Sequence, residues 1–179
     1  MTKVNSLTVW FTGLHGSGKT TIAGKLIEKL RGKNIEVALL DGDNIRKTIS
    51  GDLGYSLDDR NEHMKRVADL CRSNSENGIL SVACVASPTE ESREYARKIL
   101  ENMFLVYVRC PLEVCEKRDV KGHYKKARKK EKGFENFVGI SLKFEDPENP
   151  DIILETDRES VEESVDKLLD GLKEKEIIG

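Results

Sequence analysis

The residues with the clearest chemical potential form a glycine-rich loop at positions 13–20. The loop reads Gly-Leu-His-Gly-Ser-Gly-Lys-Thr and matches G-x-x-x-x-G-K-[ST] at every fixed position. An apolar run ending at Thr12 precedes it, and Ile22, Leu26 and Leu30 follow at the spacing of one helix face. A strand, a glycine turn and a helix N-terminus in this order bind phosphate through backbone amides. The sequence therefore predicts a phosphate-binding loop (P-loop); a glycine-rich turn with a surface lysine is the less favoured alternative.

Two side chains of the P-loop have expected roles of their own. Lys19 is expected to reach the β- and γ-phosphates of ATP, and the Thr20 hydroxyl to ligate Mg²⁺. His15 is interpreted as a spacer rather than a catalytic base, because backbone amides do the work of such a loop. The guanine-reading N/T-K-x-D motif of GTPases is absent from the sequence, which favours a small-molecule kinase.

Two carboxylates, Asp41 and Asp43, follow the second predicted strand. At the carboxyl edge of a parallel sheet next to a P-loop, they lie where a transferred phosphoryl group must pass. One can hold Mg²⁺, and the other can accept or position the hydroxyl proton of an acceptor. Arg46 would then bind an anionic group of that acceptor. The alternative is an Asp-Gly turn with Asp43 as a helix cap and a surface arginine, and capping is compatible with the functional role.

A strongly basic run occupies residues 121–132, with seven Lys and Arg residues against the single carboxylate of Glu131. Taken alone, such a run is typical of a solvated helix or an RNA-binding patch. Beside a P-loop we interpret it as a lid, over about residues 120–138, that covers the phosphates and expels water. Phe137 follows the run and could stack on a nucleobase or pack a hinge.

The elements that must position these residues alternate along the chain. Apolar runs without in/out alternation predict strands buried on both faces, and periodic polar segments between them predict helices. The predicted fold is α/β: a doubly wound parallel sheet of about five strands, with helices on both faces and a basic lid. The predicted strands are residues 4–12, 35–40, 79–86, 104–109 and 152–154.

Helix starts can also be predicted. Ser56 with Asp59 is close to a capping box, and a stripe of apolar residues over 161–172 predicts a C-terminal helix with Asp157 as its cap. Arg60, in the helix after Ser56, could bind phosphate or sulfate or belong to a solvated helix face.

Length and composition exclude several classes. The chain has 179 residues, enough for one domain, and 30 Lys and Arg residues against 32 Asp and Glu residues. A net charge of −2 argues against general nucleic-acid binding. The longest nearly apolar stretch, 79–86, is too short for a membrane span, and no signal peptide is evident. Four cysteines without a CxxC pair indicate reduced thiols and a cytoplasmic protein.

Together these residues resemble the adenylylsulfate kinase (APS kinase) family from about Leu7 to about Thr156. The P-loop alone is common, but its combination with six further motifs is specific. The motifs are Asp-Gly-Asp-Asn-Ile-Arg (41–46), Leu-Gly-Tyr-Ser…Asp-Arg (53–60), Pro-Leu-Glu-Val-Cys-Glu-x-Arg-Asp (111–119), Lys-Gly-x-Tyr-Lys-Lys-Ala-Arg (121–128), Phe-x-Gly-Ile (137–140) and Pro-Glu-Asn-Pro (147–150).

The resemblance implies a single P-loop kinase domain over residues 1–179, usually dimeric, that uses ATP and Mg²⁺. It implies transfer of the ATP γ-phosphate to the ribose 3′-hydroxyl of adenylylsulfate (APS), giving PAPS, in sulfate activation. The implied partners are a small-molecule nucleotide and a second copy of the chain, with no nucleic acid and no membrane.

The same resemblance implies a set of site residues. Lys19, Asp41 and Asp43 lie at the reacting centre, with Thr20 and Asp41 on the metal. The ATP-binding residues are Gly13, Leu14, His15, Gly16, Ser17, Gly18, Lys19, Thr20, Thr21, Arg118 and Arg128. The acceptor-binding residues are Asp43, Asn44, Arg46, Tyr55, Arg60, His63, Ser87, Lys121 and Phe137, with Tyr55 and Phe137 sandwiching the base.

Ser87 matches a serine that the family sometimes assigns as a phosphoenzyme nucleophile. No His or Lys base is visible beside it in the sequence, and direct in-line transfer needs no such intermediate. A serine at the carboxyl end of a strand could equally bind a substrate oxygen or start the following helix.

Departures from the family pattern fall in the acceptor half. Tyr55 stands where Phe is usual, His63 where Asn is usual, and Thr89 and Glu90 where an aromatic residue and Arg are usual. Reversing a charge matters, because unit charges ~4 Å apart near a protein surface interact by ~4 kcal/mol. Either Arg93 takes over, or the family's arginine is structural, or the acceptor is a different nucleotide.

Two alternative functions therefore stay open. A kinase of another nucleotide, such as cytidine diphosphoramidate, would make His63 and Glu90 specificity changes. A non-catalytic nucleotide-binding regulatory module is the alternative from another class, and it predicts loss of Lys19, Thr20 or the aspartates, all of which are present.

Overall fold

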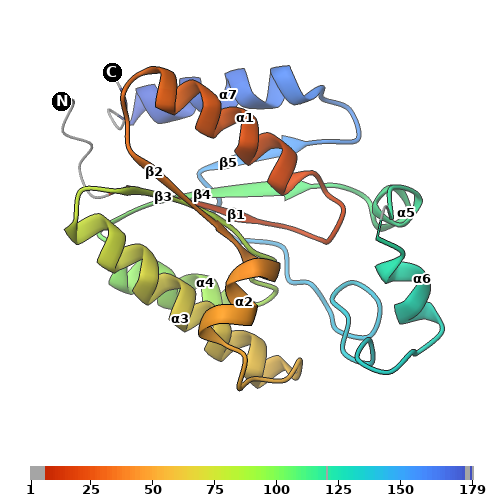
Figure 1. Ribbon diagram of the computed structural model, residues 1–179. Helices are drawn as coiled ribbons and strands as arrows, with labels where there is room; N and C mark the ends of the chain where they lie inside the picture. Colours follow the sequence, from red (N-terminus) through yellow and green to blue (C-terminus); the bar gives the residue numbers. More distant parts are fainter. Residues whose placement is uncertain (1–6, 120, 176–177, 179) are drawn as a thin grey trace.

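A five-stranded parallel sheet forms the centre of the computed structural model, which describes residues 7–119, 121–175 and 178 (Figure 1). The strand order β2-β3-β1-β4-β5, with every neighbouring pair parallel, confirms the predicted fold class. Each predicted strand is present within two or three residues of its expected bounds, and positions 4–6 lie outside the described residues. The strands are β1 (Leu7–Thr12), β2 (Val37–Asp41), β3 (Leu80–Cys84), β4 (Asn102–Arg109) and β5 (Ile152–Glu155).

Helices cover both faces of the sheet. Helices α1 (Lys19–Gly32) and α7 (Val161–Glu174) lie on one face, and α3 (Leu57–Glu76) and α4 (Glu90–Ile99) lie on the other (Figure 1). Every residue of β1 and β3 is buried, which explains why their sequences lack alternation.

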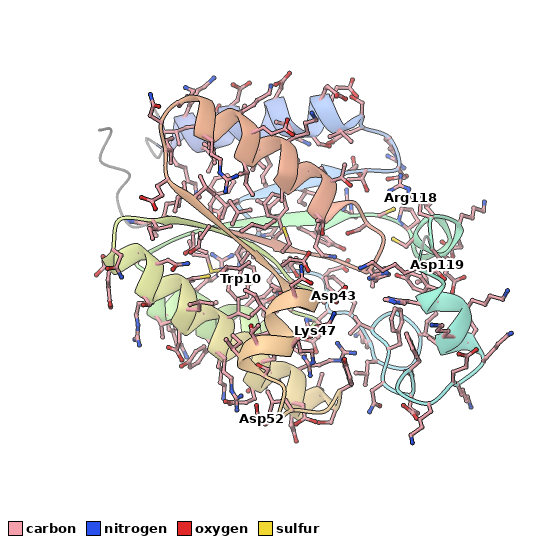
Figure 2. All side chains as sticks on the ribbon, in the orientation of Figure 1. Trp10, Asp43, Lys47, Asp52, Arg118 and Asp119 are labelled. Carbon is pink, nitrogen blue, oxygen red and sulfur yellow. The ribbon has the colours of Figure 1, made fainter. Side chains whose placement is uncertain are left out.

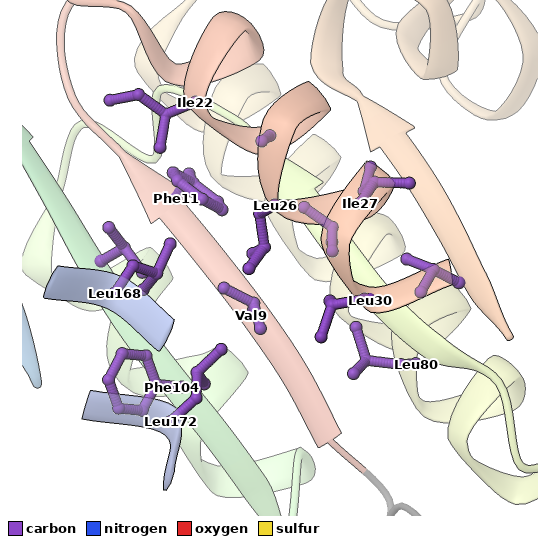
Figure 3. Close-up of a cluster of buried hydrophobic side chains, with 14 of the residues drawn as sticks. Val9, Phe11, Ile22, Leu26, Ile27, Leu30, Leu80, Phe104, Leu168 and Leu172 are labelled. Atoms are coloured by element: carbon purple, nitrogen blue, oxygen red, sulfur yellow. The ribbon is translucent and has the colours of Figure 1, made fainter. Parts of the chain in front are cut away.

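The side chains of β1 divide between two apolar clusters. Val9 and Phe11 pack with α1 and α7 in the cluster of Figure 3, which also contains Leu26 and Leu168. Trp10 points to the opposite face, among residues of α3 and α4. The two clusters hold the sheet rigid, so its carboxyl edge is a fixed platform.

Shorter helices stand beyond the carboxyl edge. Helix α2 (Gly42–Ile49) begins directly after β2, and α5 (Leu112–Lys117) and α6 (His123–Arg128) follow β4 (Figure 1). The strand register aligns Asp41 with Cys84 and Cys84 with Phe11, so β2 ends level with the start of the P-loop. The two predicted chemical segments therefore meet at one edge.

Helix caps test the sequence predictions directly. The Ser56–Asp59 capping box is present at the start of α3. Asp157 as the cap of α7 is wrong: Ser160, extended and directly before Val161, caps that helix in a box with Glu163. Asp43 as the cap of α2 is also wrong, because Asp41 accepts the Asn44 N–H and Asp43 lies in the first turn.

Two further expectations concern the chain as a whole. All four cysteines are buried free thiols, as the sequence indicated. Within the described part of the chain, no helix has both the length and the apolar composition that crossing a bilayer requires.

The cap of α7 gives a stability prediction. Replacing Ser160 with Ala should lower the free energy of unfolding by about 1 kcal/mol, because the Glu163 N–H loses the Ser160 hydroxyl as its acceptor. Asp157→Asn is the matched control and should have a smaller effect, since Asp157 forms only a surface ion pair with Arg158. Urea unfolding of both variants measures the difference; an equal loss in the two would contradict the assigned cap.

Candidate active site

The P-loop leaves the amino end of α1 open for an anion. Gly18 precedes the helix in a left-handed conformation (φ 104°), and no side chain caps the first-turn N–H groups. Gly13 also tolerates no side chain, because a Cβ there would lie 2.5 Å from the Val108 carbonyl oxygen. Uncapped amides, a positive helix end and no acidic residue in the first turn fit a polyphosphate.

Lys19 folds back over its own loop. Its Nζ donates to the carbonyl oxygens of Gly13 (2.8 Å) and Leu14 (2.6 Å). Burial lowers the pKa of Lys19 to about 8, and the nearby Cys84, Cys115, Asp43 and Asp41 offset part of that shift. An anionic phosphate would stabilise the ammonium more strongly than two neutral carbonyls do.

Thr20 and Asp41 form an oxygen pair beside the P-loop. The Thr20 hydroxyl donates to Asp41 Oδ2 at 3.4 Å, while Asp41 Oδ1 accepts the Asn44 N–H at 3.3 Å. Mg²⁺ prefers one or two protein oxygens completed by water and substrate phosphates, and this pair fits that preference. No group of three or more metal-ligating side chains exists among the described residues, so a dedicated protein cage is not built there.

Asp43 faces the predicted lid. Figure 2 shows it at the first turn of α2, and its Oδ2 accepts from Lys121 Nζ at 3.3 Å. Partial burial disfavours the carboxylate, but the hydrogen bond and charge of Lys121, with His15 and His123, keep the pKa of Asp43 below its usual value. Asp43 is therefore ionised at neutral pH and can accept a hydrogen bond.

The guanidinium groups of two arginines lie over the ring of Tyr55, in the loop that follows α2. The Cζ atoms of Arg46 and Arg60 lie 4.5 Å and 5.4 Å from the centre of the Tyr55 ring. None of the ion pairs formed among the described residues includes Arg46 or Arg60, and Arg46 donates instead to the Gly54 carbonyl oxygen. Burial, and then the charge of Arg46, lowers the pKa of Arg60 to about 10. Arg46 and Arg60 therefore form a cationic site that an anion can bind.

Arg60 connects this cationic site to the lid segment. Its Nε donates to the Tyr55 carbonyl (3.3 Å) and its Nη2 to the Asn136 carbonyl (2.6 Å). Phe137 is the next residue, and its ring packs edge-on to Tyr124 with centroids 5.1 Å apart. Arg60 thus connects the two segments that contain the predicted stacking residues, Tyr55 and Phe137.

His15 does more than space the loop. Its ring lies 4.7 Å from the ring of His123 in α6, and its carbonyl accepts from the Tyr124 hydroxyl at 2.7 Å. Burial, the charges of His123 and Lys19, and to a lesser extent Lys121 lower the pKa of His15, against Asp43, which raises it. The structure adds to the spacer interpretation that His15 is where the P-loop contacts α6.

Ser87 turns its hydroxyl into the protein. The residue is fully buried with φ +35°, its Oγ donates to Thr12 Oγ1 (2.8 Å), and it accepts from Trp10 Nε1 (3.1 Å). The Thr12 hydroxyl in turn donates to the Ala86 carbonyl. A hydroxyl engaged on both sides lacks the free approach that a nucleophile needs.

Glu90, which stands where the family usually has Arg, has its negative charge neutralised by a buried arginine. Glu90 Oε2 accepts from Nε and Nη2 of Arg93 at 2.9 and 2.7 Å, and Arg93 is fully buried. Arg93 also donates to the carbonyls of Ser87 (2.6 Å) and Glu145 (2.7 Å). Arg93 therefore does not take over as a free acceptor-binding arginine: it is a buried structural residue, with Glu90 as its counter-ion.

His63 is likewise turned inward. It is 3% exposed, and its Nδ1 lies 2.8 Å from the Ser50 hydroxyl. Burial and the charge of Arg46 lower the pKa of His63 to about 4, while a hydrogen bond to the Gly42 backbone opposes that shift. His63 is a neutral, occupied side chain under α2, not a free group facing solvent.

Of the two remaining predicted arginines, Arg118 is linked to the P-loop and Arg128 is not. Arg118, near α5 (Figure 2), donates to the carbonyl (2.6 Å) and hydroxyl (3.3 Å) of Thr156. The Thr156 hydroxyl donates to the Ser17 carbonyl, so Arg118 is linked to the loop. Arg128 instead pairs with Glu116 of α5, at 2.7 Å, and is not brought to the loop.

Sequence reasoning missed several residues that hold this site together. Thr12, Trp10, Tyr124 and Thr156 each anchor a predicted residue through a side-chain hydrogen bond. Tyr124 lies inside a motif that the resemblance had already identified, which was the available signal. The others sit in apolar or polar stretches without a distinguishing pattern.

Comparisons with known proteins agree with this geometry. A family model described as adenylylsulphate kinase matches residues 5–155. The chain is 45% identical over 175 residues to the adenylyl-sulfate kinase of Halothermothrix orenii, covering 98% of this chain and 94% of that protein. It is also similar to the solved Mycobacterium tuberculosis APS kinase CysC in complex with AMPPNP and APS, with TM-score 0.86, 40% identity and coverage of 93% and 96%.

The lowered pKa of Lys19 predicts proton uptake on nucleotide binding. With a pKa of about 8, roughly half of the free protein carries an uncharged lysine at pH 8, and a bound diphosphate should raise that pKa. Binding of ADP at pH 8 should therefore take up about half a proton, and affinity should fall as the pH rises further. Calorimetry in buffers of different ionisation enthalpy measures the uptake; Lys19→Gln, which lacks the titrating group, should show none, and equal uptake in both would contradict the assignment.

The burial of Ser87 predicts that its hydroxyl is dispensable for chemistry. Ser87→Ala should keep turnover within about tenfold of the unsubstituted protein while losing about 1–3 kcal/mol of stability, because Trp10 Nε1 loses its acceptor. The buried Ser92, whose hydroxyl bonds the Thr89 carbonyl, provides Ser92→Ala as a control. Turnover, thermal unfolding and mass spectrometry after incubation with ATP measure the outcome. Phosphoserine at position 87, or complete loss of turnover in a folded Ser87→Ala protein, would overturn this expectation.

Proposed function

This chain belongs to the adenylylsulphate kinase family, and from that premise we propose that it transfers the γ-phosphate of ATP to the 3′-hydroxyl of adenylylsulfate, giving PAPS and ADP. One observation carries the proposal: the uncapped P-loop with Lys19, and a separate pair of arginines on Tyr55 that forms no ion pair with a carboxylate of the described residues, both lie near the same carboxylate, Asp43. A donor anion and an acceptor anion therefore have distinct places on either side of one reacting centre.

The P-loop side would bind the donor. The first-turn amides of α1 and the Lys19 ammonium would hold the β- and γ-phosphates, and Lys19 would move from the loop carbonyls to the charge that develops during transfer. Arg118 and Thr156, next to Gly18, would border the rest of the nucleotide. Thr20 and Asp41 would hold Mg²⁺, which when bound would offset phosphate charge.

The α2 side would bind the acceptor. Arg46 and Arg60 would bind its phosphosulfate, and its base would lie between Tyr55 and Phe137. Asp43 would accept the hydrogen bond of the attacking hydroxyl, since its carboxylate is ionised and lies at the first turn of α2. Asn44, in the same turn, would contact the acceptor as well.

The segment at about 120–138 would act as the lid. Lys121, just before α6, pairs with Asp43, and Tyr124 of α6 donates to the His15 carbonyl, so this segment already contacts both Asp43 and the P-loop. Lys121 would exchange Asp43 for phosphate when substrates bind, and closure would exclude the water that otherwise accepts the γ-phosphate.

This geometry removes the argument for a kinase of another nucleotide, such as cytidine diphosphoramidate. Glu90 is the counter-ion of Arg93, and His63 is engaged by Ser50, so neither presents a free group to another base. The regulatory-module alternative would need a defective phosphate site, whereas Lys19, Thr20 and both aspartates stand together. A single domain over 1–179, a homodimer and a cytoplasmic location stay predictions.

An acceptor panel tests the proposal. Purified protein with Mg·ATP should consume ATP with adenylylsulfate at a kcat/KM at least about 100-fold above that with cytidine diphosphoramidate or plain nucleotides, because these ligands differ from adenylylsulfate in the base or the phosphosulfate and leave contacts of the site unmade. Lys19→Ala is the control and should lower kcat by about 10²–10³ through loss of charge stabilisation.

Two results would contradict the proposal. A higher kcat/KM for cytidine diphosphoramidate would identify the other kinase activity. Nucleotide binding without turnover of any acceptor would identify the non-catalytic module.

A further inference from the structure

Helix α2 carries acceptor-side residues but has almost no core of its own. None of its eight residues is fully buried. Two partly buried residues, Ile45 and Ile49, pack against the apolar cluster around Trp10, and specific polar contacts add to this packing. Those contacts come from α3.

Three α3 residues at helical spacing face α2 and the loop after it. Arg60 bonds the Tyr55 carbonyl, His63 contacts Ser50, and Arg66 Nη1 donates to the Ile49 carbonyl at 2.9 Å. Residues three apart lie on one face of a helix, so these three form a polar seam along α3. Arg60 and Arg66 hold the seam at its ends.

His63 lies in the middle of the seam and contacts the C-terminal end of α2. Ser50, the C-terminal cap of α2, is 1% exposed and lies 2.8 Å from His63 Nδ1. At the other end of α2, Gly42 packs closely against the end of β3, because a Cβ there would lie 3.1 Å from the Cys84 carbonyl oxygen.

We propose that His63 is a positioning residue, whose contact with Ser50 clamps the C-terminal end of α2 and so sets the affinity for the acceptor without touching it. The inference rests on the proposed function, because it assigns acceptor binding to Asn44 and Arg46 on α2. It gives a purpose to a residue that departs from the family pattern.

A neutral ring suits this position electrostatically. Arg46, Arg60 and Arg66 all lie near His63, and together with burial they keep its pKa low. The clamp therefore adds no positive charge between the arginines, and Arg46 and Arg60 keep their charge for the acceptor. A flexible cation at this position would instead repel them.

Substitutions at both ends of the clamp test the proposal. His63→Ala should raise the KM for adenylylsulfate about tenfold and leave the KM for ATP within about twofold, because Ser50 is left unpaired and α2 loosens. Ser50→Ala should shift the same parameter, and the double variant should show less than the sum of the two effects. His63→Asn, whose amide can occupy the place of Nδ1, should recover most of the acceptor affinity.

A binding measurement separates this effect from the chemical step. Adenylylsulfate titrated calorimetrically into protein saturated with Mg·ADP should show the same loss of affinity in His63→Ala and the same recovery in His63→Asn. Asn74→Ala is the matched control: Asn74 lies on α3 and donates to Ser81 at 3.0 Å, away from α2. It should lower the unfolding temperature with no change in the acceptor KM.

The outcomes divide cleanly. An unsubstituted protein that does not phosphorylate adenylylsulfate would overturn the proposed function and this inference with it. An active protein whose His63→Ala and Ser50→Ala variants change both KM values equally, or only the unfolding temperature as Asn74→Ala does, would overturn the clamp alone.

Discussion

The structure depends on one electrostatic constraint: the amino end of α1 and the Lys19 ammonium need negative charge that the protein itself does not provide. No side chain caps the helix, its first turn contains no acid, and Lys19 bonds two neutral carbonyls. Each arrangement is less favourable alone than with an anion bound. The positive charge of the P-loop is thus complementary to the negative charge of a phosphate ligand.

A related balance operates on the acceptor side. Arg46 and Arg60 share the face of Tyr55 without a carboxylate partner in the described residues, while Lys121 takes Asp43. Burial lowers the pKa of Arg60, and the positive charge of the nearby Arg46 lowers it further, so the two arginines repel. An anionic acceptor bound there would relieve that repulsion, so that substrate binding and local stabilisation would come from the same interaction.

Residues that look like changes of specificity in the sequence turn out to serve packing. Glu90 would place a negative charge beside an anionic ligand if it faced the site, but it pairs with the buried Arg93. A buried arginine needs such a partner, because an unpaired charge in the interior is strongly destabilising. Ser87 and His63 show the same inward orientation, with the Ser87 hydroxyl and His63 Nδ1 each engaged by a neighbouring side chain.

The sequence by itself determined the sheet, the P-loop and the capping box at Ser56, because these follow from local patterns: apolar runs, glycine spacing and the reach of one side chain to a nearby amide. It failed at Ser160 and at Asp41, where several polar residues compete for one cap and small backbone differences decide. Only the tertiary structure decided the directions of Ser87, His63 and Glu90, and the contact of His15 with α6. Those directions depend on partners between 3 and 109 positions away, whose distance no local pattern encodes.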